Sequence, residues 1–327
     1  MSRIHEALKK AAQERNAQLK DRSTTDVVDL SAEGLTSAVL PDNRSSDRGT
    51  QGVFSGGPNA EVQLFQEFVK KCSHPGWKIE PRFSVFSPEA NSSAGAERFR
   101  TLRSRLFQVA ASQTIRRLVI TSSVPEEGKT FVTANLAQSF ARQPECRVLL
   151  IDADLRTSRL HLPFGAPELP GLSDYLRGEA DEAQITQVGR ERNLCLIPGG
   201  RSVPNPSELL HGDRMKLLLD NMSRMFDWIL LDTPPALAVH DASVLADVCD
   251  GVLFVVRAGS TDFEVAEKAS AEFRNKNLLG VVLNRVEKQE GYGGYYYGYP
   301  AEKADHTASE PISSEQESTR LTNETLD

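Results

Sequence analysis

A loop with the residue types that bind phosphate lies in the first half of the chain. Residues 123–130 read SVPEEGKT, between the apolar run 117–121 and a segment of helical composition. Only Ser123, in place of the first glycine, departs from the spacing of a phosphate-binding loop. Between a strand and a helix, the backbone N–H groups of such a loop and the positive end of the helix face one point, which suits a nucleotide β-phosphate.

Two side chains of this loop have predicted roles. Lys129 would neutralise the β- and γ-phosphate oxygens, and the hydroxyl of Thr130 would ligate Mg²⁺. The alternative interpretation is an ordinary strand-to-helix turn that happens to contain Gly-Lys-Thr. The agreement of strand, loop and helix favours a site for a nucleotide with Mg²⁺.

Three acidic residues follow apolar runs of the kind that form buried strands. Asp152 and Asp154 come after the run 147–151, and Asp232 comes after 228–231. Because the carboxyl ends of parallel strands meet at the edge where ligands bind, we expect these acids beside the phosphate loop. Asp232 has the position of an acid that orients Mg²⁺, and the other two can provide a metal partner and a base. Acids after strands are often only helix N-caps, and that alternative stays open.

Short apolar runs recur along the chain and predict the fold class. They are apolar throughout rather than alternating, which is typical of strands covered on both faces in a parallel sheet. Helical segments separate most of them. The sequence therefore predicts an α/β domain with a doubly wound, mostly parallel sheet. The runs are 117–121, 147–151, 194–197, 228–231, 252–256 and 280–283.

Composition excludes several classes of protein. The apolar runs are far shorter than the roughly 20 residues that cross a bilayer, and the charged start, residues 1–15, lacks the apolar stretch of a secretory signal. We therefore expect a soluble, cytoplasmic protein with no direct membrane span. The four cysteines and six histidines have no metal-ligand spacing, which predicts reduced thiols and no zinc site.

The net charge of −7 resides mainly in residues 301–327, which contain seven acidic and two basic residues. The rest of the chain is nearly neutral. It lacks the concentration of Lys and Arg that a nucleic-acid-binding domain needs, so we expect no nucleic acid as a partner.

Patterning divides the chain into five regions. The first has the apolar stripe of a short amphipathic helix, although a frayed terminus is an equal alternative because isolated helices of that length are marginal in water. The regions are this helix over 1–15, a flexible linker over 16–79 with a short helix near 60–72, the folded domain over 80–290, a Tyr/Gly cluster over 291–300 and a disordered acidic tail over 301–327.

Two helices of the folded domain are well marked. Residues 95–107 carry apolar side chains on one side, as an amphipathic helix does. The sequence Asn205-Pro206-Ser207-Glu208 predicts a helix start, with Asn205 as the N-cap, a proline at the first helical position and an acid at the third.

Tyrosine is distributed unevenly, because five of the six tyrosines fall within eight residues. Glycines between them keep the backbone mobile, so each hydroxyl could reach a neighbouring active site. The pattern predicts a self-substrate, and each phosphorylation would add about −1.5 to −2 charge. A Gly-Tyr low-complexity patch or a packed segment is the alternative. The predicted phosphoacceptors are Tyr292, Tyr295, Tyr296, Tyr297 and Tyr299.

The combination of SSVPEEGKT, LLIDADLR and ILLDTPP resembles the Walker A, Walker A′ and Walker B motifs of the bacterial tyrosine kinases that act in capsule and exopolysaccharide export. The resemblance covers about residues 85–300 and includes an ExxRxxR helix, an NPSELL helix start and the tyrosine cluster. It is to the stand-alone cytosolic, CpsD/CapB-like type. It implies a deviant P-loop NTPase fold, ATP with Mg²⁺, and tyrosine autophosphorylation in trans.

The resemblance also implies catalytic roles. Asp152 would be the base that accepts the tyrosine hydroxyl proton, and Lys129 would act on the phosphates. Asp154 and Asp232 would organise Mg²⁺ together with Thr130.

Nucleotide contacts are implied in the same way. Arg156 and Arg159 would lie by the phosphates or the incoming tail, and the adenine contact would fall near Asn284. The nucleotide-binding residues would then be Ser123, Glu127, Gly128, Lys129, Thr130, Phe131 and Asn284.

Assembly and partners are further implications of the resemblance. Glu97, Arg100 and Arg103 form the ExxRxxR pattern, which would join subunits into a ring-like homo-oligomer that phosphotyrosine charge loosens. Glu97 and Arg100 can equally be an ordinary i,i+3 surface pair. The activating partner would be the cytosolic segment of a membrane polysaccharide co-polymerase or chain-length regulator, which would recruit the protein to the inner face of the membrane.

Two other functions are weighed against an autokinase. A ParA/MinD-type ATPase switch without protein kinase activity would carry a signature lysine five positions before the loop lysine, where this chain has Val124. A scaffold that binds nucleotide only to organise an export complex is the other possibility. The presence of Lys129, Thr130 and the three acids weighs against the scaffold.

Overall fold

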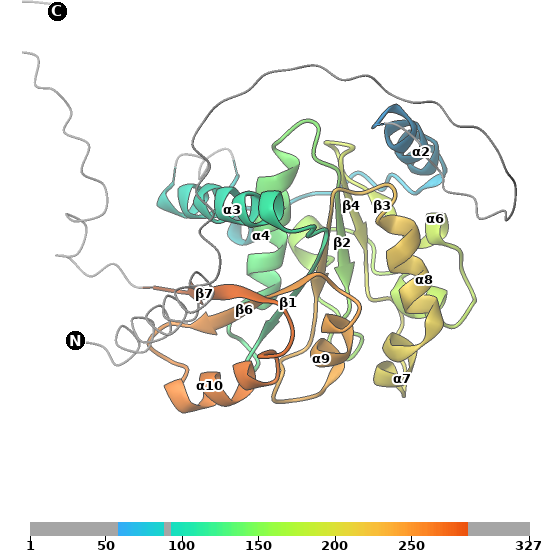
Figure 1. Cartoon of the computed structure of the whole chain (residues 1–327). Helices are drawn as coiled ribbons and strands as arrows, with labels where there is room; N and C mark the ends of the chain where they lie inside the picture. Colours follow the sequence, from blue (N-terminus) through green and yellow to red (C-terminus); the bar gives the residue numbers. More distant parts are fainter. Residues whose placement is uncertain (1–57, 88–92, 287–327) are drawn as a thin grey trace, which may run out of the picture. The chain divides into compact units, whose positions relative to one another are not determined.

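The computed structural model describes residues 58–87 and 93–286 (Figure 1). The predicted N-terminal helix over 1–15, the tyrosine cluster over 291–300 and the acidic tail over 301–327 lie outside the described residues.

Seven strands of the described residues form one sheet. They are β1 (Arg117–Ser122), β2 (Val148–Asp152), β3 (Gln187–Val188), β4 (Leu194–Ile197), β5 (Trp228–Asp232), β6 (Gly251–Arg257) and β7 (Leu278–Asn284). Their order is β3-β4-β2-β5-β1-β6-β7, and every neighbouring pair is parallel except β3 with β4. This confirms the predicted α/β class with a mostly parallel sheet.

Helices lie on both faces of this sheet (Figure 1). None of the helices in the described ranges is both long and apolar enough to cross a membrane. The α-helices are α2 (Pro58–Lys71), α3 (Ala94–Ser112), α4 (Lys129–Ala141), α5 (Leu172–Leu176), α6 (Glu182–Ile185), α7 (Pro206–His211), α8 (Asp213–Met222), α9 (Asp241–Ala246) and α10 (Phe263–Ala271), with short 3-10 turns at Pro81–Phe83 and Leu162–Phe164.

The core is divided between the two faces of the sheet, because successive strand side chains point to opposite sides. Leu118 belongs to the cluster that includes Phe140 of α4, whereas its neighbour Val119 belongs to the cluster that includes Leu218 of α8. Both side chains of that pair are fully buried. Coverage on both faces explains why the inner strands read as continuous apolar runs. The run 280–283 differs, because it belongs to the edge strand β7, where Val281 is 44% and Leu283 is 36% exposed.

The folded domain begins earlier than residue 80, which corrects the expected flexible linker over 16–79 where that range is described. The helix near 60–72 is present as α2, but it buries Phe65 and Val69 in the core that lies against α8. The ring of Phe65 packs edge-on against the ring of Phe226, with 5.3 Å between the ring centroids. Further along, Trp77 is also buried and donates to Gln187 at 3.3 Å.

Helix α3 confirms the helix predicted over 95–107 and extends it at both ends. Helix α7 begins at Pro206 as expected, with Glu208 in its first turn. The predicted side-chain cap is wrong, because Asn205 makes no capping hydrogen bond to the backbone. Its amide instead donates to the Glu208 carboxylate at 2.8 Å, which satisfies the amide without using the free N–H groups of the helix.

Candidate active site

The predicted motifs meet at the carboxyl ends of three adjacent strands. β5 lies between β1 and β2 in the sheet, and Asp232 is paired in register with both Ile120 and Asp152. The loop that leaves β1 and starts α4 therefore rises beside the acids that end β5 and β2. This is the edge at which open α/β sheets bind ligands.

The loop has two backbone positions in the left-handed region. Glu126 has a φ of 66° and Gly128 has a φ of 94°. Such alternation bends the chain into a concavity of N–H groups, to which the free N–H groups at the start of α4 add. A Cβ at Gly128 would also lie 2.1 Å from Nδ2 of Asn284, so the Asn284 side chain would have to move.

Lys129 is the cation of the site and is largely buried. Its Nζ lies 3.2 Å from Oδ2 of Asp154, and 15% of its side chain is exposed. Burial alone would lower the pKa of Lys129, but the carboxylates of Asp232, Asp154 and Asp152 outweigh burial and raise it. The lysine is therefore held in its charged form, as a contact to phosphate requires.

Thr130 joins the phosphate loop to β5. Its hydroxyl donates to Oδ2 of Asp232 at 2.6 Å, while Thr133 makes a long contact of 3.4 Å to the other oxygen. Burial raises the pKa of Asp232, and Lys129 and the Thr130 hydrogen bond oppose that rise. A hydroxyl and a carboxylate are thus fixed side by side.

Asp154 divides its two oxygens between the loop and its own turn. Oδ2 faces Lys129, whereas Oδ1 accepts from the backbone N–H of Thr157 at 3.0 Å and from its hydroxyl at 3.1 Å. The residue is 3% exposed. These contacts fix the carboxylate next to the lysine.

Asp152 is fully buried, and its carboxylate is held by its own loop. Oδ2 accepts from the hydroxyl of Ser158 at 2.7 Å and from the N–H of Leu160 at 2.9 Å. Oδ1 accepts a single longer bond, from the N–H of Asp154 at 3.2 Å, and so retains acceptor capacity. Burial, with the nearby charge of Asp232, raises the pKa of Asp152 to about 7.

Arg156 lies in the turn after these acids and is held by two partners. Its guanidinium is 3.4 Å from Oδ2 of Asp241 and donates to the hydroxyl of Ser207 at 3.0 Å. Ser207 in turn donates to Asp241, whose side chain is fully buried. Sequence reasoning missed Asp241, although its place shortly after the acid of β5 was a signal. Arg159 is exposed.

The carboxylate of Glu127 faces the protein, so the predicted contact of this residue with a nucleotide would have to come from its backbone. Oε2 accepts from the N–H of Val124 at 2.8 Å, and Oε1 accepts from the hydroxyl of Thr261 at 2.5 Å. The Glu127 carbonyl accepts from Nδ2 of Asn284 at 2.8 Å. Asn284 therefore lies against the loop with its amide nitrogen already occupied there, and its expected contact with adenine stays a prediction.

Two further loop positions differ in what they offer. Ser123 is buried and its hydroxyl has no hydrogen-bond partner among the described residues, so it can serve a bound group. Phe131 contacts the ring of Phe99 at 6.2 Å between centroids. Its side chain helps to pack α4 against α3.

The ExxRxxR residues of α3 separate into two environments. Glu97 and Arg100 form an ion pair of 3.0 Å at the surface. Arg103 instead donates to the carbonyl of Ser139 in α4 at 2.6 Å. This bond ties α3 to the helix that begins at the phosphate loop, so Arg103 has a packing role within the chain.

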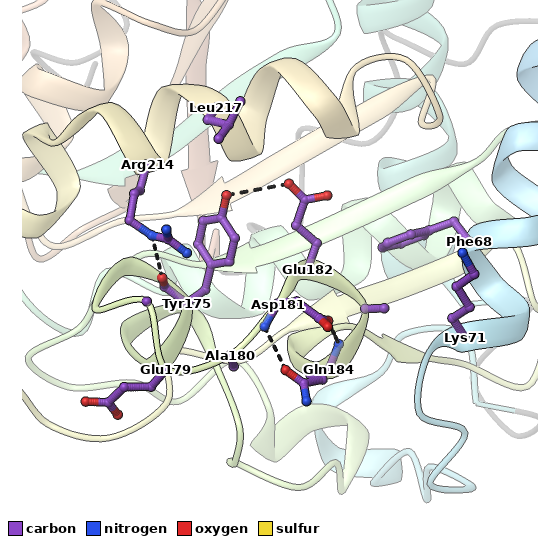
Figure 2. A pocket seen from close by; sticks show the side chains of 12 residues that line it. Phe68, Lys71, Tyr175, Glu179, Ala180, Asp181, Glu182, Gln184, Arg214 and Leu217 are labelled. Atoms are coloured by element: carbon purple, nitrogen blue, oxygen red, sulfur yellow. Dashed lines mark hydrogen bonds between the residues drawn. The ribbon is translucent and has the colours of Figure 1, made fainter.

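Tyr175, the tyrosine outside the cluster, has a structural place. It is 4% exposed, and its hydroxyl lies 3.5 Å from Glu182. The guanidinium of Arg214 lies 4.5 Å from the centre of its ring. Figure 2 shows these side chains in a shallow pocket of about 670 Å³ that is also lined by Phe68 and Leu217. The pocket is lined by none of the predicted site residues.

The donors at the phosphate loop fit Mg²⁺. Within the described residues there is no cluster of three or more His, Cys, Asp or Glu that could hold a metal by itself. Mg²⁺ bound with a nucleotide takes only one or two carboxylates and completes its shell with phosphate oxygens and water. The hydroxyl of Thr130 beside the carboxylate of Asp232 is such a donor set.

Comparison with known proteins places this geometry in context. The sequence family described as the CobQ/CobB/MinD/ParA nucleotide binding domain matches residues 118–306. Tyrosine-protein kinase YwqD of Bacillus subtilis is 37% identical over 219 residues, which are 66% of this chain and 91% of that protein. Tyrosine-protein kinase wzc of Salmonella typhimurium is 32% identical over 256 residues, which are 76% of this chain and 35% of the relative. The chain thus spans about a third of the length of wzc.

A solved structure has the same fold and related sequence. The kinase domain of the Escherichia coli tyrosine kinase ETK is 34% identical, with a TM-score of 0.58, and the match covers 66% of this chain and 86% of that domain.

Proposed function

Because this chain belongs to the bacterial tyrosine-protein kinases, within the CobQ/CobB/MinD/ParA nucleotide-binding family, we propose that it transfers the γ-phosphoryl group of ATP to tyrosines of an identical neighbouring chain. The observation that carries the proposal is the meeting of Lys129 with Asp154 and of Thr130 with Asp232 at one sheet edge. The acceptors would be the five clustered tyrosines, the first of which follows β7 by eight residues.

The donor side of the reaction is assigned to the phosphate loop. The N–H groups around Gly128 would bind the β-phosphate, and Lys129 would neutralise the β- and γ-oxygens. Thr130, Asp154 and Asp232 would hold Mg²⁺, which stabilises charge on the β- and γ-phosphate oxygens when bound. Burial of the Asp154 and Asp232 carboxylates strengthens their charge interactions relative to water.

Asp152 is proposed as the base. A carboxylate whose pKa is about 7 is well matched to accept a proton near neutral pH. The tyrosine oxygen would form its bond to the γ-phosphorus while the bond from that phosphorus to the β–γ bridging oxygen breaks. The phenolic proton would pass to Oδ1 of Asp152, which accepts one hydrogen bond from the described residues, and ADP would leave.

Transfer between chains supports a regulated assembly. Unmodified tyrosine segments would engage adjacent subunits of a ring through α3, where Glu97 and Arg100 lie at the surface. Each phosphotyrosine adds about −1.5 to −2 charge, so five would add up to roughly −10 to an eight-residue stretch. That charge would expel the segments and loosen the ring.

The biological role follows from the family resemblance. The kinase would regulate polymerisation and export of an exopolysaccharide or capsule. A cytosolic segment of a membrane chain-length regulator would bind it and recruit it to the inner face of the membrane.

The test is incubation of the purified full chain with Mg²⁺-ATP, followed by phosphotyrosine mapping by mass spectrometry. We expect phosphate on the clustered tyrosines and none with Lys129→Met, whose fold should be retained. Mixing Lys129→Met with a variant in which the five tyrosines are Phe tests transfer in trans, because only the first chain could then be labelled. Release of inorganic phosphate without phosphotyrosine would instead identify an ATPase switch.

A further inference from the structure

The side chain of Glu127 is a buried carboxylate whose hydrogen-bond partners belong to the protein. The residue is 1% exposed. Both of its oxygens are occupied by donors of the protein, one in the loop itself and the others at the last residue of β6 and in the turn that follows it. It differs in this from the acids commonly found at helix starts, which lie near solvent and act on the helix dipole.

The donors come from two directions. The N–H of Val124 closes the loop onto Oε2 at 2.8 Å. Oε1 accepts the hydroxyl of Thr261 at 2.5 Å and, more weakly, the N–H of Arg257 at 3.4 Å. The carboxylate therefore joins the loop to residues 130 and 134 positions away in sequence.

The anchor residues are themselves fixed. The N–H of Thr261 donates to the carbonyl of Arg257 at 3.2 Å, which closes the turn after β6. The N–H of Ala258 donates to the carbonyl of Asn284 at 2.9 Å, and the Asn284 side chain returns to the carbonyl of Glu127. The phosphate loop is thus hydrogen-bonded to the turn after β6, and the end of β7 is hydrogen-bonded to both.

The backbone of the loop needs such support. Glu126 adopts a left-handed φ of 66°, which a residue with a Cβ occupies at a cost of about 1 kcal/mol or more unless its surroundings fix it. The neighbouring Gly128 has the φ of 94° from which the N–H groups turn toward the concave side. Glu127 lies between these two positions in the chain, so the hydrogen bonds of its carboxylate restrain the backbone on both sides of it.

We propose that Glu127 is a positioning residue for the phosphate loop, which it locks onto Thr261 so that the loop N–H groups are aligned for a nucleotide diphosphate or triphosphate. Its carboxylate does not contact the nucleotide. The inference rests on nucleotide binding by this loop, and it deepens the proposed function because it names the group that pre-forms the site.

Nucleotide affinity of the full chain, measured by titration calorimetry with Mg²⁺-ADP and Mg²⁺-ATP, tests the proposal. Thr261→Val removes the hydroxyl and keeps the shape, and should weaken binding by roughly fivefold, while Thr261→Ser should restore it. Glu127→Ala should weaken binding by about tenfold or more, since it frees three donors. Asp262→Asn is the matched control, because this exposed residue follows Thr261 directly and, although it is the N-cap of α10, its side chain makes no capping hydrogen bond.

A double variant separates positioning from general damage. Once Glu127 is Ala, Thr261→Val should change nucleotide affinity by less than about twofold, because the bond it removes is already lost. Equal weakening by Thr261→Val in both backgrounds would overturn the proposal, as would affinity of Glu127→Ala equal to that of the unaltered chain. If Glu127→Ala lacks a cooperative thermal transition, the test rests on the nucleotide affinities of Thr261→Val and Thr261→Ser. An affinity of Thr261→Val equal to that of the unaltered chain would then overturn the proposal.

Kinetics provide a readout that structural damage would not produce. In the variants, KM for ATP should rise with the dissociation constant while kcat at saturating ATP stays within about twofold, because the reacting groups are untouched. A fall in kcat with unchanged KM would contradict the positioning role. If the unaltered chain binds nucleotide but forms no phosphotyrosine, the proposed kinase function fails while the affinity test of Glu127 still stands.

Discussion

The hydroxyl of Thr130 lies 2.6 Å from Oδ2 of Asp232, so the first turn of α4 and the end of β5 share a hydrogen bond within the site. Two oxygens that could both bind Mg²⁺, and that belong to distant parts of the sequence, are thereby fixed as neighbours. Because Asp232 is buried and bonded to Thr130, neither of these two side chains has to lose conformational freedom when a metal–nucleotide complex binds.

Thr130→Val should therefore weaken the response to Mg²⁺. Loss of the hydroxyl removes one ligand and the hydrogen bond that orients the other, so the Mg²⁺ concentration for half-maximal autophosphorylation should rise by roughly 10- to 100-fold. Thr130→Ser retains the hydroxyl and should behave like the unaltered chain. Equal Mg²⁺ titrations for the Val and Ser variants would show that the hydroxyl takes no part.

A second prediction concerns Asp152 and pH. Burial raises the pKa of Asp152 from 3.8 to about 7, so between these values the folded chain holds a proton that the unfolded chain has released. The free energy of unfolding should therefore fall as pH rises through this window, by up to about 1.4 kcal/mol per pH unit from this group.

Asp152→Asn cannot titrate and should lose that component. Urea unfolding between pH 5 and 7, in chelator to exclude metal binding, should show a flatter pH profile for the variant. The exposed Asp262→Asn should keep the profile of the unaltered chain. Parallel profiles for Asp152→Asn and the unaltered chain would mean that the pKa of Asp152 is not raised.

Much of this site could be predicted from the sequence, because the signals are local. A loop between an apolar run and a helix, and acids such as Asp154 and Asp232 after apolar runs, define the sheet edge without knowledge of the strand order. Parallel strands bring their carboxyl ends together in whatever order they pair. This is why Lys129 and Thr130 meet the predicted acids.

The features that escaped prediction depend on side-chain direction and on long-range packing. The spacing of the loop cannot tell whether Glu127 faces a phosphate or Thr261, since that depends on a turn more than 130 residues away. The cluster of Arg156, Ser207 and Asp241 joins three segments in the same way. The two-residue strand β3 is too short to show any periodicity.

A third prediction follows from the contact of β7 with the loop. Gly128→Ala should abolish nucleotide binding and lower the midpoint temperature of thermal unfolding. The new Cβ would overlap Nδ2 of Asn284, and the alanine backbone would have to adopt an unfavourable φ. Removing the overlap with Asn284→Ala should restore part of the midpoint in the double variant, while the backbone strain of about 1 kcal/mol remains. Calorimetric scans of the single and double variants check this, and an unrecovered midpoint would place the cost elsewhere.

The last prediction concerns α2. Because this helix packs into the core, the folded domain starts no later than residue 58. Phe65→Ala should reduce the free energy of unfolding by about 3–5 kcal/mol, because it removes a buried ring that contacts Phe226. Leu64→Ala on the adjacent, solvent-facing side, where the residue is 46% exposed, should change it by less than about 1 kcal/mol. Urea unfolding curves of the two variants compare them directly. Equal, small effects would mean that α2 is not part of the cooperative core and that the linker extends to residue 79 after all.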